Sequence, residues 1–355
     1  MQRLPLVLVL VLAGCSRPAD PVRIGAAGPW DAGYGRMNRN GIELALKEIN
    51  DSGGIAGRAL EVVMKDDRAD GATAAAIADE FLGRSDIVAV VGHVNSGTMV
   101  AAARIYDRGL PAVATTATSP DLTGISPWVF RVISSDSVNG GELALFAARL
   151  GHRRAAILYE NDSYGRGLTE AFRRNFNTRG EVISADPITD RGDQDFEPYI
   201  ATFTRTRPDI VFVATTEAAG IAILREASRQ GLDADFLGGD GWTGIITDTA
   251  AAEGAYVGAP FSAADPRADV QRFVAAFRAK YGVIPDGNAA LGYDATKLVA
   301  QAIAARGTDR AAVREYLALL SPAAPYRGIA GDVYFGGDGD PVSKPFVMTR
   351  VRNGT

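Results

Sequence analysis

The sequence predicts an α/β protein of two lobes, each with a doubly wound parallel sheet, between which the chain crosses several times. Short strand and helix patterns alternate along most of the chain, which is typical of parallel sheets covered by helices. The alternation restarts near residues 129–135 and changes again near 256–261. Three helices follow the second change with no long strand between them. Because they bring no sheet of their own, we expect them to pack on the sheet of the first lobe. Two such lobes leave a cleft between them, where ligands commonly bind.

The first lobe is expected to begin at residue 22. Its expected strands are 22–26, 60–64, 87–91 and 111–114, and its helices run through 42–49, 72–82 and 96–106. Residues 87–91 are a continuous apolar run rich in β-branched side chains, as in a strand buried on both faces. Ile42, Ala45, Leu46 and Ile49 form the apolar stripe of the first helix.

The second lobe repeats the pattern after residue 135. The expected strands are 155–159, 182–185, 210–214 and 235–237, with helices 140–150, 167–176, one from 196, and 221–230. Helices 269–281, 289–305 and 311–319 then return to the first lobe. Residues 331–335 and 344–351 are expected to form a hairpin closed by the sequence GGDGDP.

Composition excludes several classes of function. The chain has 355 residues, 47% hydrophobic and 22% charged, with a net charge of -5, which is ordinary for a soluble globular protein of about two domains. No basic cluster argues for nucleic acid. Two histidines and one cysteine cannot make a His/Cys metal site.

Two glycine-rich motifs do not change this picture. GGDGWTG (238–244) matches a dinucleotide fingerprint, but it lies late in the second lobe and places Asp240 where a pyrophosphate would sit. Asp338 and Asp340 lack a further acidic ligand for calcium, so a tight turn is the better interpretation. No cofactor and no metal are expected.

The amino terminus predicts export and a lipid anchor. Residues 4–13 form a short apolar run of the kind found in signal peptides. The run ends in Leu-Ala-Gly-Cys15, which resembles the lipobox of bacterial lipoproteins. This resemblance implies a signal peptide at 1–14, lipidation of Cys15 and a tether at 15–21. The alternative is an ordinary signal peptide with an incidental cysteine.

Two polar turns are expected to meet at the carboxyl edge of the first sheet. Ser96 follows the strand 87–91, and Thr115, Thr116 and Thr118 follow the strand 111–114. In a right-handed βαβ unit these turns lie side by side. Hydroxyl groups and the amino end of the helix at Ser96 can bind a carboxylate. The alternative is that Ser96 only caps its helix and the threonines only satisfy a turn. No GxSxG motif surrounds Ser96, so an enzyme is not expected.

Several stretches together resemble a known family. They are GPWDAGYG (28–35), NGIELALKEINDSGGIAG (40–57), VVGHVNSGTMVAAARIYDRGLPAVATTATSPDLT (90–123) and FLGGDGW (236–242). The chain resembles the type I periplasmic solute-binding proteins, and more closely the leucine/isoleucine/valine-binding proteins of ABC importers. The resemblance implies two lobes joined by three crossovers that close on a ligand like a flytrap. Lobe 1 would comprise 22–135 and 262–328, and lobe 2 would comprise 136–261 and 329–355.

The resemblance also implies roles for single residues. Ser96, Thr116 and Thr118 match positions that bind the carboxylate and part of the ammonium group of an amino acid. Asp240 matches the acidic position that pairs with the ammonium, and Tyr164 a second-lobe aromatic that contacts the ligand. Tyr34 and Trp30 match the wall of the side-chain pocket.

Three positions depart from the family pattern. Thr216 stands where the branched-chain amino acid binders have an aromatic residue, and Asn95 and Asn288 are polar for wall positions. These departures leave the identity of the solute open.

The leading hypothesis is a monomeric, lipid-anchored protein of the periplasm or cell envelope. It would bind an amino acid or related small solute and deliver it to the permease subunits of an ABC importer. The alternative hypothesis is a ligand-sensing flytrap that acts through a partner protein. Neighbouring permease and ATPase genes would favour import, and a kinase or regulator gene would favour sensing.

Overall fold

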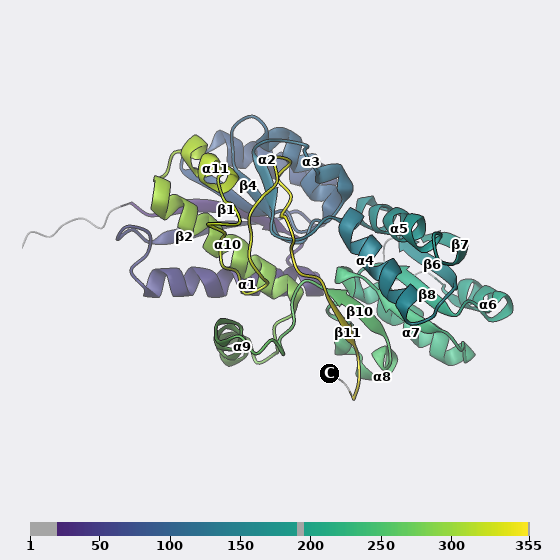
Figure 1. Ribbon diagram of the computed structural model, residues 1–355. Coiled ribbons are helices and arrows are strands. Elements are labelled where there is room, and N and C mark those ends of the chain that lie inside the picture. Colours follow the sequence, from purple (N-terminus) through teal and green to yellow (C-terminus); the bar gives the residue numbers. More distant parts are fainter. Residues whose placement is uncertain (1–19, 190–194, 354–355) are drawn as a thin grey trace, which may run out of the picture.

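Two α/β lobes lie side by side in the computed structural model, which describes residues 20–189 and 195–353 (Figure 1). The first lobe is built on a five-stranded sheet with the order β2-β1-β3-β4-β5, and every neighbouring pair is parallel. The strands are β1 Val22–Gly28, β2 Leu60–Asp66, β3 Ile87–Gly92, β4 Ala112–Ala114 and β5 Val129–Arg131. β5 was not expected as a strand, because its three residues are too few to show a period.

Helices cover both faces of the first sheet. They are α1 Gly33–Asp51, α2 Gly71–Gly83, α3 Ser96–Tyr106, α9 Ala268–Tyr281, α10 Gly287–Arg306 and α11 Arg310–Ala318. One core joins Ile42 of α1 and Leu298 of α10 to Val91 of β3. The core on the other face contains Phe81 of α2 and Met99 of α3. The late helices therefore return to the first lobe, as the sequence predicts.

The second lobe contains a six-stranded sheet with the order β11-β10-β9-β8-β6-β7. Its strands are β6 Arg154–Glu160, β7 Glu181–Ile188, β8 Ile210–Ala214, β9 Asp235–Gly238, β10 Tyr256–Ala259 and β11 Val347–Arg350. The helices are α4 Asp136–Arg149, α5 Ser163–Phe176, α6 Glu197–Thr206, α7 Glu217–Gln230 and the short α8 Thr249–Ala252. Separate cores on the two faces contain Phe203 and Phe172. The predicted pair of doubly wound sheets is thus confirmed.

The expected carboxyl-terminal hairpin is wrong. β11 pairs antiparallel with β10, at the edge of the second sheet, where the yellow end of the chain lies in Figure 1. Val333 instead bridges to Tyr326, and Phe335 bridges to Pro341. Both segments alternate in polarity as strands do, but the choice of strand partner depends on contacts far away in the sequence.

The chain also leaves the first lobe later than the expected boundary at residue 329. Ile329, Val333 and Phe335 are buried in the core of the first lobe. The ring of Phe335 lies 4.9 Å from that of Phe130, between centroids. The backbone N–H of Arg131 donates to the carbonyl of Gly339. Residues 329–339 therefore pack on the first lobe, because their apolar side chains complete its core.

Candidate ligand-binding cleft

The two polar turns of the first lobe meet at the carboxyl edge of its sheet. The hydroxyl oxygen of Ser96 accepts hydrogen bonds from the backbone N–H groups of Thr118 and Ser119, both at 3.1 Å. Thr116 donates its hydroxyl to the carbonyl of Val94 at 2.9 Å. The geometry expected for a right-handed βαβ unit is therefore present.

Ser96 does not cap its helix. The N-cap of α3 is Asn95, and no side chain caps the helix there. Within the part of the chain that the structure describes, the N-cap side chain leaves the first N–H groups of α3 uncapped, at the end where the helix dipole is positive. Ser96 holds the neighbouring turn as an acceptor, and its own hydroxyl proton remains available to an anion.

The second lobe contributes a tyrosine and an aspartate. Tyr164 lies in the first turn of α5, and Asp240 begins the short 3-10 helix η2 Asp240–Trp242. The Tyr164 hydroxyl accepts from the N–H of Gly241 at 3.0 Å and donates to Asp240 Oδ1 at 3.3 Å. Burial raises the pKa of Asp240 to about 7. A carboxylate held like this gains from a positive charge beside it.

Asp136 is a site residue that the sequence reasoning missed. It is fully buried at the start of α4, and its N–H donates to the carbonyl of Thr118 at 2.9 Å. Among the described residues, no donor meets hydrogen-bond geometry with either carboxylate oxygen of Asp136. Burial raises the pKa of Asp136 well above its ordinary value, and the charge of Asp240 raises it further. An acidic residue in the first turn of a helix is common, so the sequence held no distinct signal for it.

Most of the predicted residues line one cavity of about 50 Å³ between the lobes. Its lining comprises Tyr34, Val94, Asn95, Ser96, Thr116, Asp162, Tyr164, Thr216, Asp240, Gly241 and Asn288. Thr118 is buried behind Ser96, and its hydroxyl lies near Asp136, where it lowers the pKa of that carboxyl. Trp30 does not line this cavity, because its ring packs against Gly28 in the first-lobe core. The expected role of Trp30 in the pocket wall stays a prediction.

Several further residues that line the cavity are polar. Asn95 donates its amide to the Tyr34 hydroxyl at 3.0 Å. Thr216 donates its hydroxyl to Oε1 of the buried Glu160 at 2.7 Å. Asn288 reaches across the cleft and donates to the Thr243 hydroxyl of the second lobe at 3.1 Å. The contact between Asn288 and Thr243 joins the two lobes, whereas the other two contacts each lie within one lobe.

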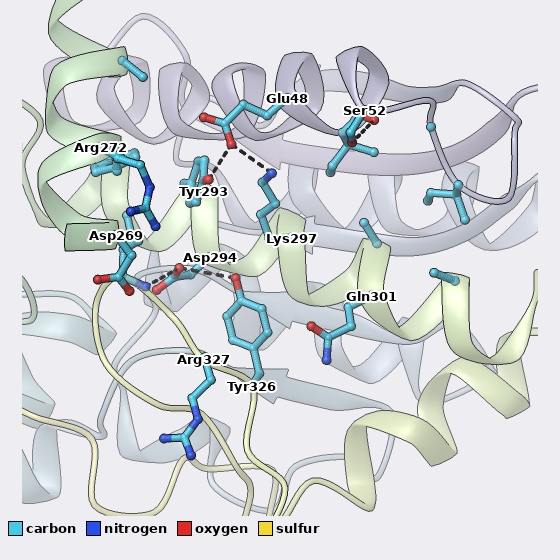
Figure 2. A pocket seen from close by; sticks show the side chains of 18 residues that line it. Glu48, Ser52, Asp269, Arg272, Tyr293, Asp294, Lys297, Gln301, Tyr326 and Arg327 are labelled. Atoms are coloured by element: carbon cyan, nitrogen blue, oxygen red, sulfur yellow. Dashed lines mark hydrogen bonds and ion pairs between the residues drawn. The ribbon is translucent and has the colours of Figure 1, made fainter. Parts of the chain in front are cut away.

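A larger cavity of about 620 Å³ lies elsewhere, on the first lobe alone (Figure 2). Side chains of α1, α9 and α10 line it. Glu48 accepts from the Tyr293 hydroxyl at 2.6 Å and pairs with Lys297 at 2.9 Å. Asp294 accepts from the N–H groups of Ile329 and Ala330. These polar groups already satisfy one another, so the cleft between the lobes is the stronger candidate.

Two further structural findings concern metals and membranes. Within residues 20–189 and 195–353, no three His, Cys, Asp or Glu side chains gather in a way that could hold a metal ion. None of the helices in those same ranges combines the length and apolar character needed to cross a bilayer. Cys15 lies outside the described residues.

Comparison with known proteins agrees with this geometry. The sequence profile of the periplasmic binding proteins matches residues 21–355. The chain belongs to the periplasmic binding protein family. The predicted resemblance is thereby confirmed, and the family assignment makes the protein a solute-binding protein and not an enzyme.

Named relatives of this binding protein fall in the same group. An amino acid binding protein of Pseudomonas aeruginosa is 30% identical over 84% of this chain and 82% of its own. The crystal structure of an ABC transporter substrate-binding protein from Desulfitobacterium hafniense in complex with Leu is 34% identical, with a TM-score of 0.80 over 94% of this chain and 98% of that chain. The isoleucine complex of LivJ from Streptococcus pneumoniae is 28% identical, with a TM-score of 0.88 over 94% and 97%.

Proposed function

We propose that this protein captures an amino acid between its two lobes and delivers it to an ABC importer from a lipid anchor at Cys15. The observation that carries the proposal is the cavity itself. Hydroxyl groups and the positive end of α3 line it together with the buried Asp240, and the buried Asp136 lies next to Thr118. The carboxylate and ammonium groups of an amino acid complement these two sets of groups.

The first lobe would hold the ligand carboxylate. Ser96 and the free N–H groups of α3 are the donors, and Thr116 lies beside them in the cavity lining. A helix N-terminus binds anions through both its N–H groups and its dipole. Ser96 is only 3% exposed, so water competes little for these donors.

The second lobe would hold the ligand ammonium. Asp240 accepts one hydrogen bond from Tyr164 and keeps further acceptor capacity. Asp136 is fully buried, and no donor in residues 20–189 and 195–353 meets hydrogen-bond geometry with its carboxylate oxygens, which is costly for a charged carboxylate. An ammonium placed between them would offset the burial of both, and Thr118 would complete this end.

The role in import is supported by the relatives, two of which are named as components of transporters. Isothermal titration of the full-length protein against the common amino acids tests the binding step. At least one amino acid should bind with a Kd in the micromolar range or below, roughly -8 kcal/mol or better. Removal of its α-ammonium, as in the corresponding carboxylic acid, should abolish binding. Equal binding of the deaminated compound would contradict the proposed roles of the aspartates.

A further inference from the structure

The wall around the ligand's side chain would consist almost entirely of polar residues. Val94 is the one aliphatic side chain among the residues that line the cavity. Small-molecule sites that receive aliphatic groups are mostly apolar. An aliphatic group pressed against a polar wall leaves buried polar atoms without partners, which weakens binding. The lining is therefore poorly suited to a branched aliphatic side chain.

Thr216 presents a hydrogen-bond acceptor to the cavity. Its hydroxyl donates to Glu160 Oε1 at 2.7 Å, and the same oxygen accepts from the Thr216 N–H at 2.9 Å. The hydroxyl has one proton, and that proton is committed to Glu160. The oxygen can therefore only accept from a ligand. The Glu160 carboxylate, 3% exposed, polarises the hydroxyl and strengthens it as an acceptor.

Asn288 presents a second acceptor from the opposite lobe. Its side-chain nitrogen donates to Thr243 Oγ1 at 3.1 Å and to Asp286 Oδ2 at 3.0 Å. Both amide protons are then in use. The carbonyl oxygen is the group that Asn288 has left for a ligand, and the residue is only 9% exposed.

The charged side chains that line the cavity, Asp162 and Asp240, are both acidic. Asp162 lines the cavity, and its charge helps to raise the pKa of Asp136, although burial and Asp240 raise it more. Asp162, Asp240 and the buried Glu160 place carboxyl groups, which accept hydrogen bonds, at or beside the cavity. These acceptors favour a ligand that carries hydrogen-bond donors besides its α-ammonium group.

We propose that the ligand is an amino acid whose side chain ends in a hydrogen-bond donor, namely a hydroxyl, amide or ammonium group. This inference rests on the proposed function, because it assumes that an amino acid occupies the cleft. The donor would be received by Thr216 and Asn288.

Pairs of amino acids of equal shape test the proposal. Threonine and valine differ by a hydroxyl in place of a methyl group, and asparagine and leucine differ by an amide in place of a branched alkyl end. Titration calorimetry with the full-length protein should show at least one polar member binding at least about tenfold more tightly than its apolar partner. Diaminobutyrate and ornithine test the third donor, because their side chains end in an ammonium group. Valine and leucine binding as tightly as the polar members would overturn the inference and leave the proposed function standing. Failure of every amino acid to bind would overturn the proposed function as well.

A variant shows whether the wall is responsible. Thr216→Val keeps the shape and removes the acceptor, so the preference for the polar member should fall by about tenfold. Thr204→Val is the matched control, because the Thr204 hydroxyl donates within α6 to the Ile200 carbonyl, away from the cavity. It should leave the ratio unchanged. Circular dichroism checks that both variants are folded. A polar-to-apolar ratio that Thr216→Val leaves unaltered would exclude Thr216 as the acceptor.

Discussion

Arg131 and Asp340 form a two-bond ion pair although 209 residues separate them in the chain. The Arg131 nitrogens donate to the two carboxylate oxygens, each at 2.7 Å. The same guanidinium donates to the carbonyl of Ser119 at 2.9 Å and to the Thr123 hydroxyl at 2.8 Å. Arg131 is only 2% exposed. One side chain thus ties the carboxyl-terminal segment to the loop that follows Thr118.

Asp340→Asn should destabilise the protein by about 3 kcal/mol, because it leaves the buried Arg131 charge without its anionic partner. Urea unfolding at neutral pH measures the change. Asp338→Asn is the matched control, since Asp338 is exposed and its oxygen can still accept from the N–H of residue 340. The control should change stability by about 0.5 kcal/mol or less. Equal effects of the two variants would show that the ion pair contributes no stability.

Asp240→Asn should weaken binding of an amino acid by about 30-fold or more, since it removes the negative charge that faces the ammonium. Titration calorimetry of the variant and the parent with the same ligand gives the ratio. Asp233→Asn removes an exposed carboxylate on the same lobe and serves as the control. Unaltered affinity in Asp240→Asn would mean that Asp240 is only a turn residue or that the solute has no ammonium group.

Affinity should depend on pH through the same carboxylate. Burial raises the pKa of Asp240 to about 7 in the ligand-free protein, and a bound ammonium lowers it by favouring the charged form. Binding therefore releases protons at and below neutral pH. Affinity should rise with pH by up to about tenfold per unit and level off above about 7. Calorimetry between pH 5 and 8.5 in buffers of different ionisation enthalpy measures both effects. An affinity that is constant across this range is incompatible with the assignment.

Ligand binding should close the lobes, because the proposed contacts come from both of them. Asn288 of the first lobe already meets Thr243 of the second across the cleft. Small-angle X-ray scattering should show a smaller radius of gyration at saturating ligand. Asp240→Asn, titrated at the same ligand concentrations, should contract less. No contraction of the parent protein would place the binding site within one lobe or show lobes that are closed before binding.

Cys15→Ser should release the protein from the membrane fraction or stall its processing, because the acyl chains on Cys15 are the proposed anchor. Fractionation of cells that express each form measures the distribution. The soluble amino acid binding of the variant should equal that of the parent. Unchanged membrane association of Cys15→Ser would exclude this anchor.

Local patterns in the sequence were enough to predict the repeating elements of both lobes and the meeting of two polar turns. The apolar run of β3 and the hydroxyl residues after β3 and β4 can each be recognised in a short stretch of sequence. The handedness of βαβ units then brings Ser96 beside Thr118. The resemblance added Asp240 and Tyr164, which the structure places in hydrogen-bond contact.

The tertiary structure alone decided the rest. Asp136 resembles any acidic residue at a helix start, and only the packing of the lobes buries it beside Asp240. Trp30 resembles a loop aromatic of a pocket wall, yet the first-lobe core encloses it. β11 resembles half of a hairpin, but the free edge of β10 takes it instead. Each of these outcomes depends on which distant surfaces meet, and periodicity within a short stretch carries no information on that.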